Sequence, residues 1–239
     1  GIPVVHDLLG VGQNLRDHPF VPVTFRVKEG HVMNEFDPRL QMILTWTAEG
    51  SHLRRDMIIV TLSYAVEDWV RGSGSGSQEP IGFRLATGLY LAVGSGELRL
   101  TSADPDQQPS LDYRYLHEEF DLRRMREGTR LVVRLAEHQS LKELIQERVS
   151  PTDAELASDE KLDEFMLRNA TTGHHISGTC KMGPASDSMA VVDQYGKVHG
   201  MENLRVVDAS IMPDCIRANT NVTTMMIGEH IADFIRQGR

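Results

Sequence analysis

The chain has 239 residues, 40% of them apolar, and a formal net charge of −9 at pH 7. This composition is that of a globular protein with one large domain or two smaller ones. The negative charge argues against nucleic acid or an anionic membrane as a partner, and no apolar run approaches the roughly 20 residues that cross a bilayer. Two cysteines, Cys180 and Cys215, are too few for a disulfide framework, so a cytoplasmic location is expected.

The first half of the chain predicts β-strands. Residues 1–18 are rich in turn residues and predict a connecting segment. Residues 20–27 alternate loosely and contain β-branched side chains, which favours a strand, and apolar runs at 57–62, 81–93 and 97–101 favour three more. Because turns separate these four runs, they predict an antiparallel sheet.

A strict Gly/Ser repeat at 72–77 interrupts this region. Glycine and serine bury no apolar surface, so the segment is expected to be a flexible loop. Its regularity resembles an engineered linker that replaces a longer loop, and a natural low-complexity loop is the alternative. Both interpretations stay open.

The second half of the chain predicts helices. From 116 to about 147, apolar residues recur at helical spacing between Arg and Glu, at Leu122, Met125, Val132 and Leu135. Residues 151–153 break this pattern. Another helix starts at 158–160 and carries three apolar residues on one face, Leu162, Phe165 and Met166. A last helix is predicted at 221–236, with four core residues, Met225, Ile227, Ile231 and Phe234.

Two regions near the C-terminus concentrate polar chemistry. Residues 171–183 read Thr-Thr-Gly-His-His-Ile-Ser-Gly-Thr-Cys-Lys-Met-Gly. Residues 206–213 and 219–229 supply an Asp and two amides. A histidine that takes up a proton, with a neutral amide beside it, suits proton abstraction from a weak acid such as an alcohol.

These regions resemble the C-terminal signature of the glucose–methanol–choline (GMC) oxidoreductases, FAD enzymes that act on alcohols. The family pattern His-x-x-Gly-Thr-x-x-Met-Gly corresponds here to His175, Gly178, Thr179, Met182 and Gly183. The later pattern corresponds to Asp208, Ala209, Ser210, Asn219, Asn221 and Thr223. Two further family-like segments lie upstream, at 10–18 and 96–105.

The dinucleotide-binding unit with which this family begins, Gly-x-Gly-x-x-Gly after a first strand, is not found in the sequence. Gly10 and Gly12 lack the third glycine of that pattern, and Pro19 follows soon after. The chain therefore resembles the C-terminal half of a GMC enzyme. Its start at Gly1, without Met or signal peptide, is interpreted as that of a fragment, a proteolytic product or a split protein.

The resemblance implies an α+β fold in three parts. Residues 1–18 would be a connecting segment of the FAD domain, and residues 19–170 an antiparallel-sheet substrate-binding domain with helices. Residues 171–239 would supply the C-terminal strand and helix of the flavin-binding α/β domain. The implied cofactor is FAD and the implied substrate a small alcohol. The missing N-terminal FAD-binding half would be a partner, in the same or a separate polypeptide.

By this resemblance His175 is the catalytic histidine, since Gly178-Thr179 follows at the family spacing. A neutral imidazole can take the alcohol proton while the α-hydrogen leaves as hydride to flavin N5. Asn219 matches a position that is Asn or His in the family, and its amide would orient the substrate oxygen without titrating. The alternatives are a structural histidine in a core and an asparagine in a turn before a helix.

His174 and the cofactor contacts are assigned by the same resemblance. His174 either shapes the substrate pocket or only packs. Asn14 lies in a family-like loop near the flavin. Asp208 and Ala209 resemble the family's contact with the ribityl and pyrophosphate part of FAD, where Asp208 would accept a hydrogen bond from a hydroxyl or a backbone turn.

The start of the last helix completes the set of cofactor contacts. Its N-terminus would face the flavin pyrimidine and favour the anionic form of the ring. The residues involved are Asn221, Val222 and Thr223. Asn221 is equally suited to be an N-cap, because asparagine is a preferred capping residue.

Other chemistries are disfavoured. No Cys-x-x-Cys or His-Glu-x-x-His occurs, and the adjacent pair His174-His175 would point to opposite sides of a strand, so no metal site is expected. No Gly-x-Ser-x-Gly indicates a hydrolase. Two rival functions stay open: a hydroxynitrile lyase on the same fold, and a non-catalytic fragment that binds a small molecule or its missing half. The sequence predicts neither the alcohol nor the electron acceptor.

Overall fold

The structure, a computed structural model, describes residues 2–31, 36, 38–70, 73, 74 and 76–239. Within the Gly/Ser repeat, Gly72 and Ser75 lie outside the described residues. The chain divides into two compact units. The first comprises 1–18, 92–115 and 172–239, and the second comprises 19–91 and 116–171. From the sequence, residues 92–115 are expected in the substrate-binding domain 19–170, but in the structure they cluster with the first unit. The assignment of the cofactor to one unit and of the substrate to the other stays a prediction.

The second unit is built on an antiparallel sheet. Five strands follow one another in the order β3-β4-β5-β2-β8. Their bounds are β2 Pro19–Val27, β3 Leu40–Trp46, β4 Met57–Val66, β5 Pro80–Leu89 and β8 Ile145–Ser150. The expected antiparallel sheet with helices is confirmed. The strands predicted at 20–27, 57–62 and 81–93 are β2, β4 and β5, whereas β3 and β8 are additional.

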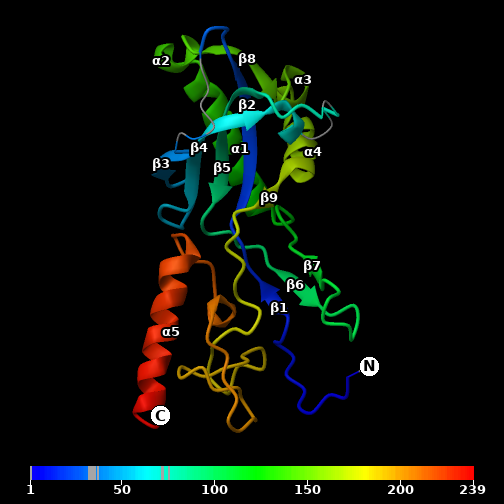
Figure 1. Cartoon of the computed structure of the whole chain (residues 1–239), viewed down its shortest axis with the longest axis vertical. Helices are drawn as coiled ribbons and strands as arrows, with labels where there is room; N and C mark the ends of the chain where they lie inside the picture. Colours follow the sequence, from blue (N-terminus) through cyan, green and yellow to red (C-terminus); the bar gives the residue numbers. More distant parts are fainter. Residues whose placement is uncertain (1, 32–35, 37, 71–72, 75) are drawn as a thin grey trace. The chain divides into compact units, whose positions relative to one another are not determined.

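Alternation along the strands separates the two faces of this sheet. Val23 lies opposite Leu85 and Phe25 opposite Phe83, whose rings stack with centroids 5.3 Å apart. Side chains of this face pack with Val132 of α1 (Glu119–Ala136), which crosses the sheet in Figure 1. The opposite face carries a second apolar cluster of Phe20, Ile58, Ala86 and Tyr90. Because successive side chains of a strand point to opposite faces of the sheet, the sheet has an apolar layer on each face.

The predicted helix from 116 to 147 is wrong beyond residue 136. The chain instead forms α1, the short α2 (Gln139–Lys142) and then β8. The His138 side chain accepts from Ser140 N at 3.4 Å, and Arg26 of β2 donates to Glu147 of β8 at 2.8 Å. Pairing with β2 thus overrides the helical pattern of the sequence. The remaining helices of this unit are η1 Glu67–Trp69, α3 Asp153–Leu156 and α4 Asp159–Asn169.

The predicted helix after 158 is confirmed. Ser158 caps α4 by accepting from Lys161 N at 3.3 Å. Its predicted apolar face is fully buried, as Leu162, Phe165 and Met166 show.

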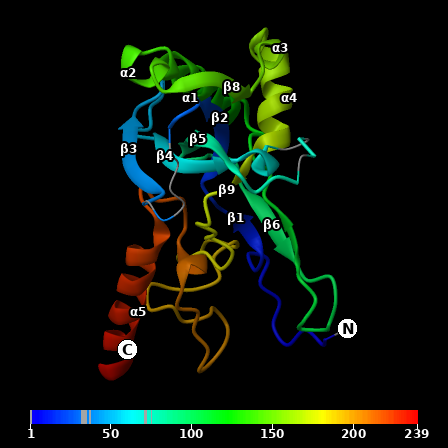
Figure 2. The same cartoon turned by 45° about the horizontal axis from the view of Figure 1, so that its top comes forward.

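The first unit contains a small sheet, one long helix and much irregular chain. The sheet has the order β1-β6-β7, with β1 at Gln13–Leu15, β6 at Gly96–Arg99 and β7 at Ser110–Asp112. The run predicted at 97–101 is therefore a strand, but it pairs in this separate sheet. Figure 2 shows the irregular chain beside α5 (Thr220–Arg236) in yellow to orange. The short helix η2 (Ala209–Ile211) completes the first unit. The short strand β9 (Thr171–Thr172) lies at the boundary between the two units.

The last helix buries only part of its apolar face within this unit. Ile231 is buried in a cluster with Val191, Val192 and Val198, and Ile227 and Phe234 pack against it. Met225, also predicted to be a core residue, is 57% exposed in this chain. Among the helices of the described residues, none is both long and apolar enough to cross a membrane.

One ion-pair network is buried in the second unit. Arg124 is fully buried and its guanidinium donates to Asp56 at 2.7 Å, to Asp121 at 2.5 Å and to the Leu91 carbonyl at 2.9 Å. Asp56 also accepts from Ala48 N at 3.0 Å. Since a buried carboxylate without its cation is costly, α1 and the loop before β4 are held together by this network.

Arg124→Met should therefore destabilise the protein by about 3–5 kcal/mol, because it leaves two buried carboxylates without their cation. The free energy of unfolding in urea measures this. Arg130→Met is the matched control on the same helix, because Arg130 pairs with Asp159 at the surface. Its effect should be much smaller. Equal losses in the two variants would contradict the role of the buried network.

Candidate functional site

Backbone hydrogen bonds align the three motif segments of the first unit. On one side of the 177–182 segment, Ser177 and Arg16 exchange N–H···O bonds of 2.9 Å, and Gly12 N donates to Thr179 O at 2.9 Å. On its other side Gly178, Cys180 and Met182 donate to the carbonyls of Ala209, Ser210 and Ile211 at 3.2, 2.9 and 2.8 Å. The two C-terminal motifs and the upstream segment 10–18 are therefore neighbours in space.

Gly178 is required at the centre of this alignment. Its φ is +87°, and a Cβ there would lie 2.4 Å from the Asn14 carbonyl oxygen. Asn14, itself at φ +59°, donates from Nδ2 to Gly178 O at 3.2 Å and to Pro213 O at 3.3 Å. The side chain of Asn14 thus ties the motif segments together, and its predicted contact with a cofactor stays a prediction.

Asp17 organises the histidines of the site. Its carboxylate is only 4% exposed and accepts from His18 N at 2.8 Å, His175 N at 3.0 Å and Tyr115 Oη at 2.5 Å. Three donors from three distant parts of the sequence therefore satisfy one buried charge. The backbones of both histidines are fixed by it.

The imidazoles of His18 and His175 form a direct pair. Their Nδ1 atoms are 2.9 Å apart, and the rings meet edge to face at 67° with centroids 4.9 Å apart. His18 Nε2 lies 2.9 Å from the Ile216 carbonyl oxygen. Within the described part of the chain, Nε2 of His175 has no hydrogen-bond partner.

Burial sets the protonation of this site. Burial lowers the pKa of His175 below its ordinary value, against the raising effect of Asp17, and His174 lowers it slightly further. His175 is therefore neutral at pH 7. Burial, and then the hydrogen bond to Asp17, raise the pKa of the Tyr115 hydroxyl. Tyr115 thus keeps its proton and remains a donor to Asp17.

The other predicted catalytic and substrate residues lie in the same unit. His174 is exposed, sits at φ +62°, and its backbone N donates to Thr172 Oγ1 at 2.8 Å. Asn219 is exposed and occupies the N-cap position of α5, without a side-chain hydrogen bond to the helix. Asp208 caps η2 by accepting from Ser210 N at 2.8 Å, and Ala209 O accepts from Gly178 N.

The predicted N-cap at Asn221 is wrong by two residues. α5 begins at Thr220, so Asn219 is the cap and Asn221 lies in the first turn. Asn221 and Val222 are exposed, and Thr223 is half-buried. The first turn of α5 carries no acidic residue. Its N–H groups therefore keep their positive potential.

Two residues of this site, His18 and Tyr115, are not predicted from the sequence. The only signal for His18 was its place at the end of the family-like segment 10–18, next to Asp17. Tyr115 had no local signal, because its role depends on a partner 98 positions away. Among the residues that the structure describes, no three His, Cys, Asp or Glu side chains could hold a metal ion.

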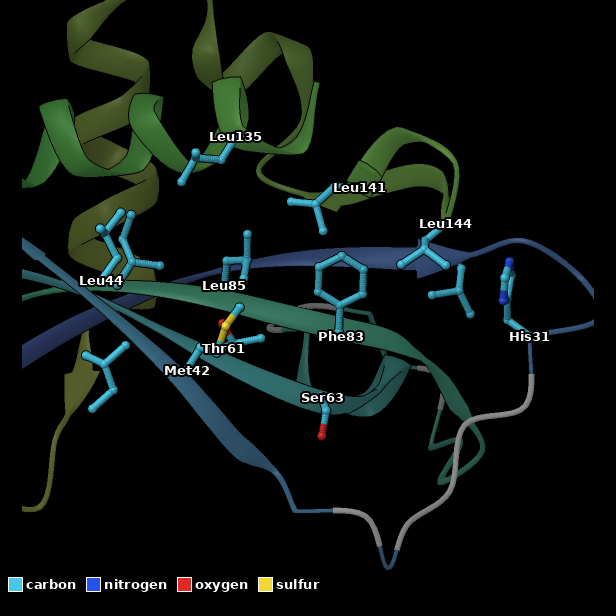
Figure 3. Close-up of a pocket in the computed structure, with 13 residues that line it drawn as sticks. His31, Met42, Leu44, Thr61, Ser63, Phe83, Leu85, Leu135, Leu141 and Leu144 are labelled. Atoms are coloured by element: carbon cyan, nitrogen blue, oxygen red, sulfur yellow. The ribbon is translucent and has the colours of Figure 1, made fainter. Parts of the chain in front are cut away.

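A separate cavity of about 590 Å³ lies within the second unit. Figure 3 shows Leu135, Leu141 and Leu144 on one side and strand residues such as Phe83 and Leu85 on the other, with His31 at one end. Its lining is mainly aliphatic, with Thr61 and Ser63 as polar groups. None of the predicted site residues lines this cavity.

Solved structures share this fold over the whole chain. A mutated formate oxidase of Aspergillus oryzae RIB40 superposes with a TM-score of 0.83, at 23% identity, over 100% of this chain and 49% of that one. A pyridoxine 4-oxidase from Mesorbium loti gives a TM-score of 0.79, at 21% identity, over 99% and 45%. At these identities the likeness concerns the fold alone.

Curated sequence relatives and a family sequence model also match the chain. An oxygen-dependent choline dehydrogenase of Cronobacter sakazakii (strain ATCC BAA-894) is 37% identical over 253 residues, which cover 98% of this chain and 45% of that protein. Oxygen-dependent choline dehydrogenase 1 of Chromohalobacter salexigens is 33% identical over 261 residues, with the same coverage. The chain thus spans about half the length of the curated relatives it matches. The sequence model of the GMC oxidoreductases matches residues 92–228, and the chain belongs to this family.

Proposed function

We propose that this chain supplies the proton-accepting and substrate-orienting side of a site that oxidises an alcohol to a carbonyl with FAD. The observation that carries the proposal is the state of His175. It is a neutral imidazole whose Nδ1 is held by His18, whereas no described residue makes a hydrogen bond to its Nε2. A nitrogen of this kind is suited to accept a proton from a hydroxyl placed within hydrogen-bond distance.

Hydrogen bonds to neighbouring residues make His175 well suited to accept a proton. Its backbone is held by Asp17 and its ring by His18, so the base needs little reorganisation when the proton arrives. Burial keeps it neutral near pH 7 and so ready to accept. After the transfer the imidazolium would stabilise negative charge that develops beside it.

The residues at the start of α5 fit a flavin. The first turn carries no carboxylate and exposes Asn221 and Val222, so the helix N-terminus favours an electron-rich or anionic ring. Gly178 N donates a hydrogen bond to Ala209 O, which places Asp208 and Ala209 beside Gly178. FAD, when bound, would supply the acceptor for the hydride of the alcohol. We place the rest of the cofactor site in the part of the relatives' length that this chain does not span.

Asn219 is the proposed orienting residue. An exposed amide at the N-cap of α5 can donate to or accept from a substrate oxygen without changing charge. The names of the relatives favour small polar alcohols, since two of them are called choline dehydrogenases. His174, exposed and adjacent to the proposed base, is assigned to the substrate side of the site.

A hydroxynitrile lyase is the second candidate, because the same base could deprotonate a cyanohydrin without any hydride transfer. Addition of an alcohol under anaerobic conditions separates the two functions. An oxidoreductase bleaches its flavin absorbance, whereas a lyase leaves it unchanged.

His175→Ala should lower the rate constant of flavin reduction by about 10²-fold or more, because loss of a general base costs about 10²–10⁴. Substrate binding should suffer less. Stopped-flow absorbance of the complete, FAD-loaded enzyme under anaerobic conditions, with the alcohol varied, measures both quantities. A variant that reduces its flavin at the parent rate would contradict the assignment of His175 as the base.

The pH dependence follows from the same residue. A base must be deprotonated, and burial lowers the pKa of His175 below its ordinary value, so the rate of flavin reduction should rise with pH in the acidic range and then level off. This rising part of the pH profile, the acidic limb, should disappear or change in His175→Ala. A rate that falls as pH rises from 5 to 7 would have the wrong sign for a base.

Asn219→Ala should slow flavin reduction and leave the acidic limb of the pH profile in place, because an amide does not titrate. We expect a loss of about 10- to 100-fold for a single orienting hydrogen bond. Asn203→Ala is a control, since Asn203 is an exposed asparagine of the same unit outside the site. If Asn219→Ala removed the limb and His175→Ala kept it, the two roles would be reversed.

A further inference from the structure

Both ring nitrogens of His18 have defined neighbours, and one of these neighbours fixes a proton. The Ile216 carbonyl, 2.9 Å from His18 Nε2, can only accept a hydrogen bond. Nε2 of His18 must therefore carry a proton. In a neutral imidazole the other nitrogen, Nδ1, then holds a lone pair and can only accept.

Burial of the His18 side chain favours its neutral form. Its side chain is 1% exposed, so a second proton would place a charge in a site from which water is excluded. The nearest carboxylate, Asp17, already accepts from Tyr115 and from two backbone N–H groups.

The proton positions on His175 follow from those on His18. Its Nδ1 is 2.9 Å from a nitrogen that can only accept, so it must donate and therefore carries a proton. A neutral His175 then has its lone pair on Nε2. This is the nitrogen to which no described residue makes a hydrogen bond.

We propose that His18 is a positioning residue that fixes the tautomer and the ring orientation of His175, so that Nε2 of His175 is presented as the proton acceptor. This inference rests on the proposed function for its catalytic consequence, but not for the tautomer itself. The chain Ile216 carbonyl, His18, His175 determines the tautomer through hydrogen bonds alone.

The hydrogen bond between the rings persists through the proton transfer. The alcohol O–H bond breaks with its electron pair left on oxygen, and a new N–H bond forms at Nε2. His175 then carries a positive charge, while its Nδ1–H still donates to His18. Because a hydrogen bond from a charged donor is stronger than one from a neutral donor, His18 stabilises the product of the transfer more than its reactant.

Four charged or titratable groups surround the pair in the contacts described for this chain. Asp17 faces both backbones, Tyr115 and the Cys215 thiol donate to Asp17, and His174 precedes His175 in sequence. Among these, Asp17 raises the pKa of His175 and His174 lowers it. A change at His18 alone leaves all four groups in place.

Two substitutions of His18 distinguish its role as a hydrogen-bond acceptor from the space that its side chain fills. His18→Asn places an amide oxygen near the former Nδ1 and retains an acceptor for His175. His18→Leu fills similar space and accepts nothing. We expect His18→Leu to slow flavin reduction about 10- to 100-fold, as for the loss of a hydrogen bond to a charged group, and His18→Asn to recover most of this loss.

The pH profile gives a readout that a purely structural role would not move. An acceptor at Nδ1 stabilises the imidazolium of His175 and raises its pKa. His18→Leu should therefore shift the acidic limb to lower pH, and His18→Asn should leave it near the parent position. His199→Leu is the control, since His199 Nε2 also pairs with a carbonyl, Gly183 O at 3.0 Å, but does not contact His175. The His199→Leu substitution should leave the acidic limb of the pH profile and the tautomer of His175 unchanged.

Nitrogen-15 spectra of the histidine-labelled protein test the tautomer without turnover. The parent protein and His18→Asn should show the proton of neutral His175 on Nδ1, and His18→Leu should show a mixture or the proton on Nε2. A parent His175 with its proton on Nε2 overturns the inference, even if His18→Leu fails to fold. An unchanged tautomer and pH profile in folded His18→Leu overturns it as well. Activity retained by His175→Ala would instead refute the proposed function and leave the spectra to decide on His18.

Discussion

The candidate site depends on the buried carboxylate of Asp17. A carboxylate with so little exposure is costly unless donors surround it, and its donors come from His18, His175 and Tyr115. The carboxylate therefore draws three segments of the chain to one point. Two of the three bonds are to backbone N–H groups, which lack rotamer freedom. The positions of the two imidazoles thus follow from the main chain, and side-chain contacts only select their rotation.

The close approach of the motif segments serves the same geometry. At Gly178 any side chain would meet the Asn14 carbonyl, so the segment after His175 can lie against the upstream loop only with glycine there. The consecutive backbone bonds to 209–211 then hold the second motif on the other side. A histidine in such a frame is kept neutral by burial and oriented by its neighbours, as expected of a base that acts near pH 7.

The sequence predicts the parts of this molecule whose cause is local. Alternating apolar residues in 20–27 predict β2, and the serine before 159–169 predicts the start of α4, because periodicity and capping act over a few residues. Strand β8 follows a helical pattern and is decided by pairing with β2, and Met225 has the spacing of a core residue yet is exposed. His175 could be selected from its motif. His18 could not, because its partner lies 157 positions away and only the distance between two ring nitrogens reveals it.

The interrupted course of the first unit has a consequence for folding. Its segments 1–18, 92–115 and 172–239 are separated by the two parts of the second unit, and the contact of His18 with Ile216 closes a loop of 198 residues. Closing such a loop costs conformational entropy, and contacts between distant residues slow folding. Strands β4 and β5, by contrast, pair across the much shorter connection 67–79. The histidine pair therefore depends on contacts between distant residues, and we expect it to form after the sheet of the second unit.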